Sequence, residues 1–204
     1  MTEEALAWRL TELLRAHDAV RSVRLVGSRA EGGATVLSDV DLLVEADFGA
    51  LEPDLVGLVA ALEPLASQWD RLSEEASYFM LLLPGGIKVD LVFDEPPTLE
   101  PPWRVSAATL PGIDAHFWDW ILWLGGKQLG GRDELVASML GGILFEHLLG
   151  PLGVERPPAT IHEAVRAYIA ARDAREAQLG VTVARELEEA VLPRLRAAGV
   201  IGER

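Results

Sequence analysis

Cysteine is absent from the 204-residue sequence. Its absence excludes disulfide bonds, thiolate metal sites and a cysteine nucleophile, so carboxylate and imidazole groups are the remaining side-chain metal ligands. Oxygen ligands of this kind suit Mg²⁺ or Mn²⁺. The composition therefore favours one of these ions over thiolate-bound zinc, if the protein uses a metal.

Basic residues are few: 18 lysines and arginines face 32 aspartates and glutamates, which gives a formal net charge of −14. Proteins that grip DNA or RNA gain most of their affinity by neutralising phosphates with lysine and arginine. The charge balance therefore predicts no nucleic-acid partner. It would instead attract a cationic small molecule.

An uninterrupted apolar stretch of the ~18 to 20 residues that span a bilayer is not apparent, and the first residues lack the basic start of a signal peptide. We therefore expect a cytoplasmic protein with no membrane partner. Half of the residues are hydrophobic and a quarter are charged, as in a folded globular protein. This length accommodates two lobes.

The first half of the chain shows alternating helix and strand signals. Leucines at helical spacing predict a helix near the N-terminus, and short β-branched or apolar runs predict strands. The expected elements are a first helix through Leu6, Leu10, Leu13 and Leu14, strands at 23–26 and 40–44, a helix at 51–65, and a hairpin of 78–83 with 87–93. The predicted fold class is α/β (α+β), with a small mixed sheet and flanking helices.

Residues 94–112 are rich in proline and resemble a linker. Beyond them the signals are helical, with Gly150-Pro151 and Pro157-Pro158 as breaks. We therefore predict a catalytic domain at 1–103 and an all-helical domain at 104–204.

Three aspartates carry the chemistry of the predicted sheet. Because strand side chains alternate, Asp39 and Asp41 share one face, and Asp90 projects from a later apolar strand beside Lys88. Carboxylates that lie close together repel one another unless a cation neutralises them. If the strands are neighbours, the three acids form a site for two divalent ions roughly 3.5 to 4 Å apart, the arrangement used for in-line displacement at phosphorus.

Gly27-Ser28 is a turn directly after the first predicted strand. Glycine lets the backbone approach a phosphate, and the serine hydroxyl and nearby amides can donate hydrogen bonds to it. Arg29 could add positive charge there or be an ordinary surface residue. Gly-Ser turns and Asp-x-Asp strand ends are common separately, whereas their combination with Asp90 favours a functional site.

The segments 26–34 (VGSRAEGGA) and 38–44 (SDVDLLV) resemble the DNA polymerase beta-like nucleotidyltransferase superfamily, specifically its small bacterial members. The resemblance implies that Gly27 and Ser28 hold a nucleoside triphosphate, that Asp39 and Asp41 bind two Mg²⁺ ions, and that Asp90 completes the triad. The residues expected near the nucleotide are Gly27, Ser28, Arg29, Ser38, Lys88 and Lys127.

The helical second half looks like the lobe of antibiotic nucleotidyltransferases of the aminoglycoside and lincosamide type. Those enzymes transfer a nucleoside monophosphate to a drug hydroxyl and use the helical lobe to enclose the acceptor. The resemblance therefore implies AMP transfer from ATP to a small molecule, and the net charge of −14 would favour a cationic one. The same motif also occurs in protein-modifying and antitoxin-like nucleotidyltransferases, and a nucleotide-sensing module without turnover is a third reading.

Two residues of the helical half are candidate ligands. Lys127 follows Trp120 and Trp123 on one helical stripe, where it could reach a phosphate, although tryptophans at this spacing usually pack in a core and the lysine can extend to solvent. Glu146 extends the stripe of Leu135 and Met139 and could bind an acceptor ammonium, serve as general base in place of Asp90, or form an ordinary salt bridge. The sequence leaves the acceptor, the preferred nucleotide and the oligomeric state open.

Overall fold

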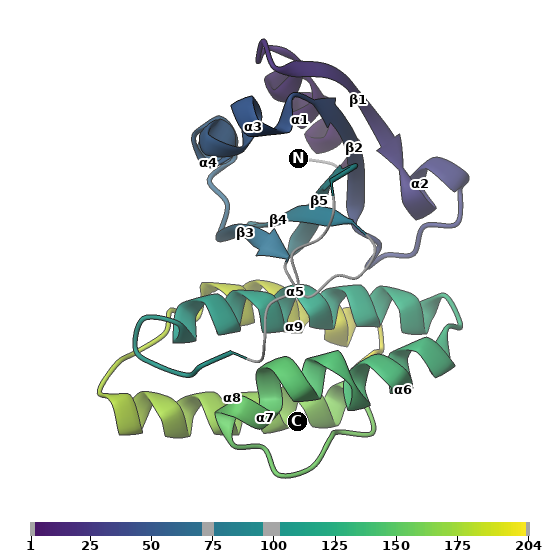
Figure 1. Ribbon diagram of the computed structural model, residues 1–204. Helices are drawn as coiled ribbons and strands as arrows, with labels where there is room; N and C mark the ends of the chain where they lie inside the picture. The colour runs from purple at the N-terminus through teal and green to yellow at the C-terminus, as the bar shows by residue number, and fades with distance from the viewer. Residues whose placement is uncertain (1–2, 71–75, 96–102, 203–204) are drawn as a thin grey trace. The chain divides into compact units, whose positions relative to one another are not determined.

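The computed structural model describes residues 3–70, 76–95 and 103–202. The chain divides into two compact units, one of Met1–Ala34 with Ser38–Leu99 and one of Thr35–Leu37 with Glu100–Arg204 (Figure 1). Most prolines of the predicted linker, at 96, 97, 101 and 102, lie outside the described residues.

The first unit is built on a five-stranded mixed sheet with the order β1-β2-β5-β4-β3. The central strands β2 and β5 are parallel, and the other neighbours are antiparallel. The expected mixed sheet is thus confirmed. The strands are β1 (Val20–Val26), β2 (Val40–Ala46), β3 (Ala66–Asp70), β4 (Ser77–Leu83) and β5 (Ile87–Phe93).

Helices cover one face of this sheet. Helix α1 (Glu3–Arg15) buries Leu6, Leu10 and Leu14, and α4 (Leu55–Val59) buries its two end residues. These side chains form one cluster with alternate residues of β2, β4 and β5, because every second strand residue points to the same side. The unit's shorter helices are α2 (Gly27–Glu31), α3 (Phe48–Leu51) and the 3-10 turns η1 (Glu52–Asp54) and η2 (Ala60–Leu62).

Two predictions for this unit were wrong in detail. The helix expected at 51–65 is divided among α3, η1, α4 and η2; Pro53 lies in η1, and a proline removes a helical hydrogen bond unless it lies in the first turn. Strand β3 was missed because ASQWD shows no clear alternation of apolar and polar residues. Only its pairing with β4 defines it as a strand.

The second unit is helical, which confirms the fold expected for the second half. Its central helix α5 buries residues all around its circumference, as expected for a helix surrounded by others, and it contacts α6, α8, α9 and η3. Helix α5 begins inside the predicted linker, because Pro111 lies in its first turn, where proline is favoured. The elements are α5 (Leu110–Leu129), α6 (Asp133–Gly141), the π-helix η3 (Leu144–Leu149), α7 (Gly150–Leu152), α8 (Ile161–Leu179) and α9 (Glu186–Ala197).

The run Asp133–Leu152 is long and apolar enough to cross a membrane by length and composition alone, which differs from the sequence expectation. Core helices of water-soluble proteins meet the same criterion. Several of its apolar residues are buried: Val136, Leu140, Leu144, Leu148, Leu149 and Leu152.

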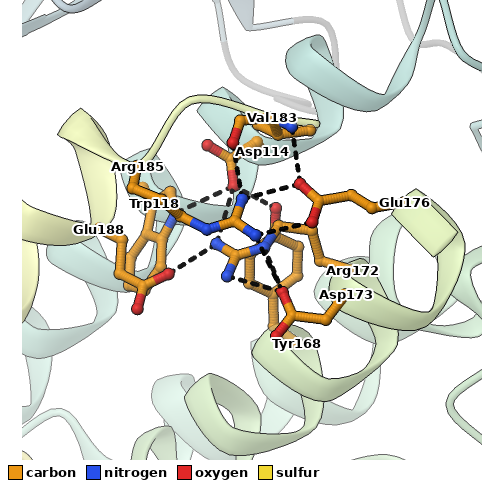
Figure 2. A network of polar contacts seen from close by, with 9 residues as sticks. All are labelled: Asp114, Trp118, Tyr168, Arg172, Asp173, Glu176, Val183, Arg185 and Glu188. Carbon is orange, nitrogen blue, oxygen red and sulfur yellow. Dashed lines mark hydrogen bonds and ion pairs between the residues drawn. The ribbon is translucent and has the colours of Figure 1, made fainter. Parts of the chain in front are cut away.

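A buried polar network joins α5, α8 and α9 (Figure 2). Arg172 is 1% exposed, and its guanidinium lies 2.7 Å from a Glu188 carboxylate oxygen and 3.6 Å from Asp114 Oδ1. Asp114 also accepts hydrogen bonds from the Tyr168 hydroxyl and, at 3.1 Å, from Trp118 Nε1. Burial raises the pKa of Asp114, while the bond from Tyr168 and the charge of Arg172 oppose that rise.

Beside this network, Arg185 Nη2 lies 2.6 Å from Glu176 Oε2, and the Val183 amide donates to Glu176 Oε1 at 2.6 Å. The hydrogen bond from Arg185 lowers the pKa of Glu176 to about 2. The turn between α8 and α9 is therefore fastened by charge-assisted hydrogen bonds.

Candidate functional site

Parallel pairing of β2 and β5 brings the three predicted acids together. Asp41 and Asp90 are register partners on these strands, and Asp39 immediately precedes the first residue of β2. One carboxylate oxygen from each of the three lies within 4.8 Å of the others. The acids therefore converge at one point of the sheet, as the sequence predicted if the strands were neighbours.

Strand alternation explains why these acids share a face. Val40, Leu42 and Val44 of β2 are buried in the core cluster, as are alternate residues of β5. The intervening positions of both strands must then point to the other face of the sheet. The same pattern that builds the core thus presents Asp41 and Asp90 on the opposite face.

The site is largely shielded from water. Asp39 is 9% exposed and Asp90 is 6% exposed, whereas Asp41 is half-buried. Burial raises the pKa of Asp90 to about 6; the positive charge of Lys88 opposes the shift, and the negative charges of Asp39 and Asp70 add to it. Asp90 Oδ1 accepts no hydrogen bond within the described part of the chain.

Lys88 lies among these carboxylates. Its side chain is 6% exposed, its ammonium contacts Asp90 Oδ2, and it lies 3.8 Å from Asp39 Oδ2. The sequence suggested a nucleotide-binding role for Lys88, and the structure shows it paired with the acids themselves. The ammonium partly neutralises a cluster that would otherwise repel itself.

Gly27 makes room for Asp41. Its φ is +67°, and a Cβ atom at this position would lie 2.2 Å from Asp41 Oδ2. Both features require glycine, because other residues rarely adopt this φ and no side-chain carbon fits so close to an oxygen. Gly27 and Ser28 open α2 directly after β1, so the predicted phosphate turn lies beside the acids.

Arg29 fixes the backbone that carries the first acid. Its Nε donates to the Asp39 carbonyl oxygen at 2.8 Å, and its Nη2 donates to the Ser38 carbonyl oxygen at 2.6 Å. Nη2 also lies 2.7 Å from Glu3 Oε2. These contacts give Arg29 a role in positioning Asp39 that the sequence did not reveal, and its contact with a nucleotide stays a prediction.

Asp70 is a further acid near the cluster that the sequence did not indicate. It ends β3 and is paired with Tyr78, which is paired with Val92, so it lies on the same face of the sheet as Asp90. Its charge contributes to the raised pKa of Asp90. No signal in the sequence could have found it, because β3 itself was not recognised.

The two ligand residues predicted in the helical unit are Lys127 and Glu146. Lys127 Nζ lies 5.2 Å from the centre of the Trp123 ring, a cation–π contact. Glu146 is exposed on the π-helix η3. The buried stripe of the run through α6 and η3 consists of Val136, Leu140 and Leu144, so Glu146 does not extend a buried face as its spacing suggested.

The donor set fits a hard divalent cation. The ligand atoms are carboxylate oxygens, which Mg²⁺ and Mn²⁺ prefer. A buried Asp90 oxygen without a hydrogen bond has unused capacity for a cation, and Gly27 keeps a side chain away from Asp41. These residues therefore suit the metal that the sequence predicted.

A comparison with protein families agrees with this geometry. Residues 8–100 match the family described as "Nucleotidyltransferase domain". No curated protein matches the chain. A solved structure described as the polymerase core of TRAMP, an RNA surveillance complex, is 12% identical with a TM-score of 0.36, over 98% of this chain and 57% of that one; this likeness is too distant to carry functional weight. The matched residues carry the mixed sheet and the three acids and are similar to a nucleotidyltransferase domain, and a helical C-terminal part follows them.

Proposed function

We propose that this protein is a metal-dependent enzyme that transfers AMP from ATP to a hydroxyl group of a small, cationic acceptor, such as an aminoglycoside or lincosamide antibiotic, in the cytoplasm. The observation that carries the metal-dependent reaction is the convergence of Asp39, Asp41 and Asp90, whose ligand atoms lie within 4.8 Å of one another. The acceptor class rests on the sequence resemblance and on the charge of −14.

In the proposed reaction, the acceptor hydroxyl oxygen forms a bond to the α-phosphorus of ATP. The bond from that phosphorus to the bridging oxygen breaks, and pyrophosphate leaves with the bond's electrons. The hydroxyl proton passes to a carboxylate, for which Asp90 and Glu146 are the candidates. Of the two, Asp90 lies in the acid cluster that would hold the metal, so we take it as the first candidate.

The residues of the site divide the remaining work. Asp39, Asp41 and Asp90 would hold two Mg²⁺ or Mn²⁺ ions, which would stabilise negative charge on the phosphates and the departing pyrophosphate. Gly27 leaves space beside Asp41, and the Ser28 hydroxyl is available to donate to a phosphate oxygen. Ser38, Arg29, Lys88 and Lys127 complete the proposed nucleotide site, and Glu146 is the proposed acceptor contact.

Transfer of label tests this proposal. The purified protein would be incubated with Mg²⁺, ATP labelled at the α-phosphate and a panel of aminoglycosides and lincosamides. A labelled drug that appears with wild-type protein, is lost on chelation of the metal, and is absent for Asp41→Asn would support the proposal. Asp18→Asn is the matched control, because Asp18 is an exposed acid of the same unit outside the site.

Two outcomes would count against this function. Absence of both triphosphate binding and transfer to any acceptor would contradict a nucleotidyltransferase. Label that appears on a co-purified protein instead of a drug would favour the protein-modifying alternative.

A further inference from the structure

Lys88 lies beside the carboxylates that would hold a metal ion. It is two residues before Asp90 on β5, so both side chains point to the same face of the sheet. Its ammonium contacts Asp90 Oδ2 and lies 3.8 Å from Asp39 Oδ2. With 6% exposure, this cation is held within the acid cluster and is not a solvated surface lysine.

A lysine ammonium and a divalent metal cannot share these oxygens at low energetic cost. Both are cations, and two like charges at this separation repel strongly in a partly buried site. The oxygen that the ammonium contacts, Asp90 Oδ2, belongs to one of the three residues that fit the metal. Metal held by the unbonded Asp90 Oδ1 and the neighbouring acids would therefore repel the ammonium on Oδ2 and favour its displacement.

A displaced ammonium needs another anionic partner. Lysine has a long flexible chain and three donors that can be redirected. A nucleoside triphosphate that arrives with the metal supplies that partner, because its phosphate oxygens are strong acceptors for an ammonium group. Free metal supplies no such partner.

We propose that Lys88 is a built-in competitor of the metal: it holds the carboxylates together without metal, weakens the binding of free metal, and moves to a phosphate when metal and triphosphate bind together. This inference rests on the proposed function, since it concerns the same metal site. It makes binding of metal depend on binding of nucleotide. Lys88 then acts as a positioning residue for the acids and as a contact for the triphosphate.

The proposal predicts effects of opposite sign on two affinities. Replacing Lys88 by a neutral residue should tighten the binding of free metal by about 10-fold or more, because the competing charge is gone. It should weaken the binding of a metal–triphosphate complex by about 10-fold, because one charge-assisted contact is lost. A lysine with a purely structural role would lower both affinities when removed.

The experiment measures free Mn²⁺ by electron paramagnetic resonance during titrations of the full chain, with and without a non-hydrolysable ATP analogue. The first variant is Lys88→Met. If it folds poorly, Lys88→Gln replaces it, because the glutamine amide can still donate a hydrogen bond to Asp90. Arg24→Met is the matched control, since Arg24 is an exposed cation of β1. Melting temperatures without metal should fall for the Lys88 variants, and added Mn²⁺ should raise them more than it raises the wild-type value.

The outcomes separate this inference from the proposed function. Tighter free Mn²⁺ with weaker Mn²⁺–analogue binding supports the proposal, whereas a loss of both affinities, a gain of both, or no change overturns it. If the Lys88 variants show this pattern but the wild-type protein transfers no label, the proposed function is contradicted and the role of Lys88 stands.

Discussion

Substitution of Gly27 by alanine tests the geometry of the acid cluster most directly. The added Cβ atom would lie 2.2 Å from Asp41 Oδ2 and 3.0 Å from Asp41 Cγ. The oxygen would have to move by about 1 Å to reach an ordinary contact distance, which turns Asp41 away from its partners. A misplacement of this size costs about 100-fold in rate at a reacting centre.

The same substitution also carries a backbone cost, which Gly32→Ala isolates. Gly32 has a φ of +76° and nothing within 4 Å of an added Cβ atom. Each alanine should cost about 1 to 2 kcal/mol for the left-handed conformation, or roughly 4 to 8 °C in melting temperature per kcal/mol for a domain of this size. Gly32→Ala should show only this loss of stability, whereas Gly27→Ala should also lose metal binding.

Calorimetric titration with Mg²⁺ in the presence of a non-hydrolysable triphosphate, together with thermal melting, distinguishes the two effects. We expect Gly27→Ala to bind metal about 10- to 100-fold more weakly and Gly32→Ala to bind it like wild type. The reasoning would be refuted by a folded Gly27→Ala protein with wild-type metal affinity. It would also be refuted if both variants lost metal affinity equally.

Three further predictions concern charge. Asp39→Asn and Asp41→Asn should abolish Mg²⁺-dependent triphosphate binding, measured by titration. Neither should lower the free energy of unfolding, because removing a like charge relieves repulsion, and a marked loss of stability would contradict this. Arg172→Met should lower the free energy of unfolding in urea by about 3 to 5 kcal/mol, since the buried Asp114 carboxylate loses the positive charge beside it. The control Arg156→Met, at an exposed arginine, should leave it unchanged. The pKa of Glu176 is lowered to about 2, so the ionised carboxylate stabilises the folded protein by up to about 3 kcal/mol above pH 4.5, and this is lost as the pH falls towards 2. The free energies of unfolding of wild type and Glu176→Gln should therefore differ at pH 7 and converge near pH 2. A difference that stays constant with pH would refute the lowered pKa.

The sequence alone was sufficient to predict that the three acids face the same side of the sheet, because the alternation of strand side chains is a local pattern. A period of two in residues 39–44 and 87–93 assigns each side chain to a face without knowledge of the rest of the chain. Gly27 was also readable, because a glycine between a β-branched run and a polar turn marks a special backbone position. The helical second half followed from spacing in the same way.

Tertiary structure decided what lies next to what. The parallel pairing of Asp41 with Asp90 depends on β2 and β5, which are far apart in the chain, and β3 with Asp70 is defined only by its bonds to β4. Pairing of Lys88 with the acids and of Arg29 with two carbonyl oxygens likewise depends on side-chain directions that spacing does not give. The sequence therefore determined which acids share a face, and the fold determined their neighbours, because contacts between distant segments arise only when the sheet is assembled.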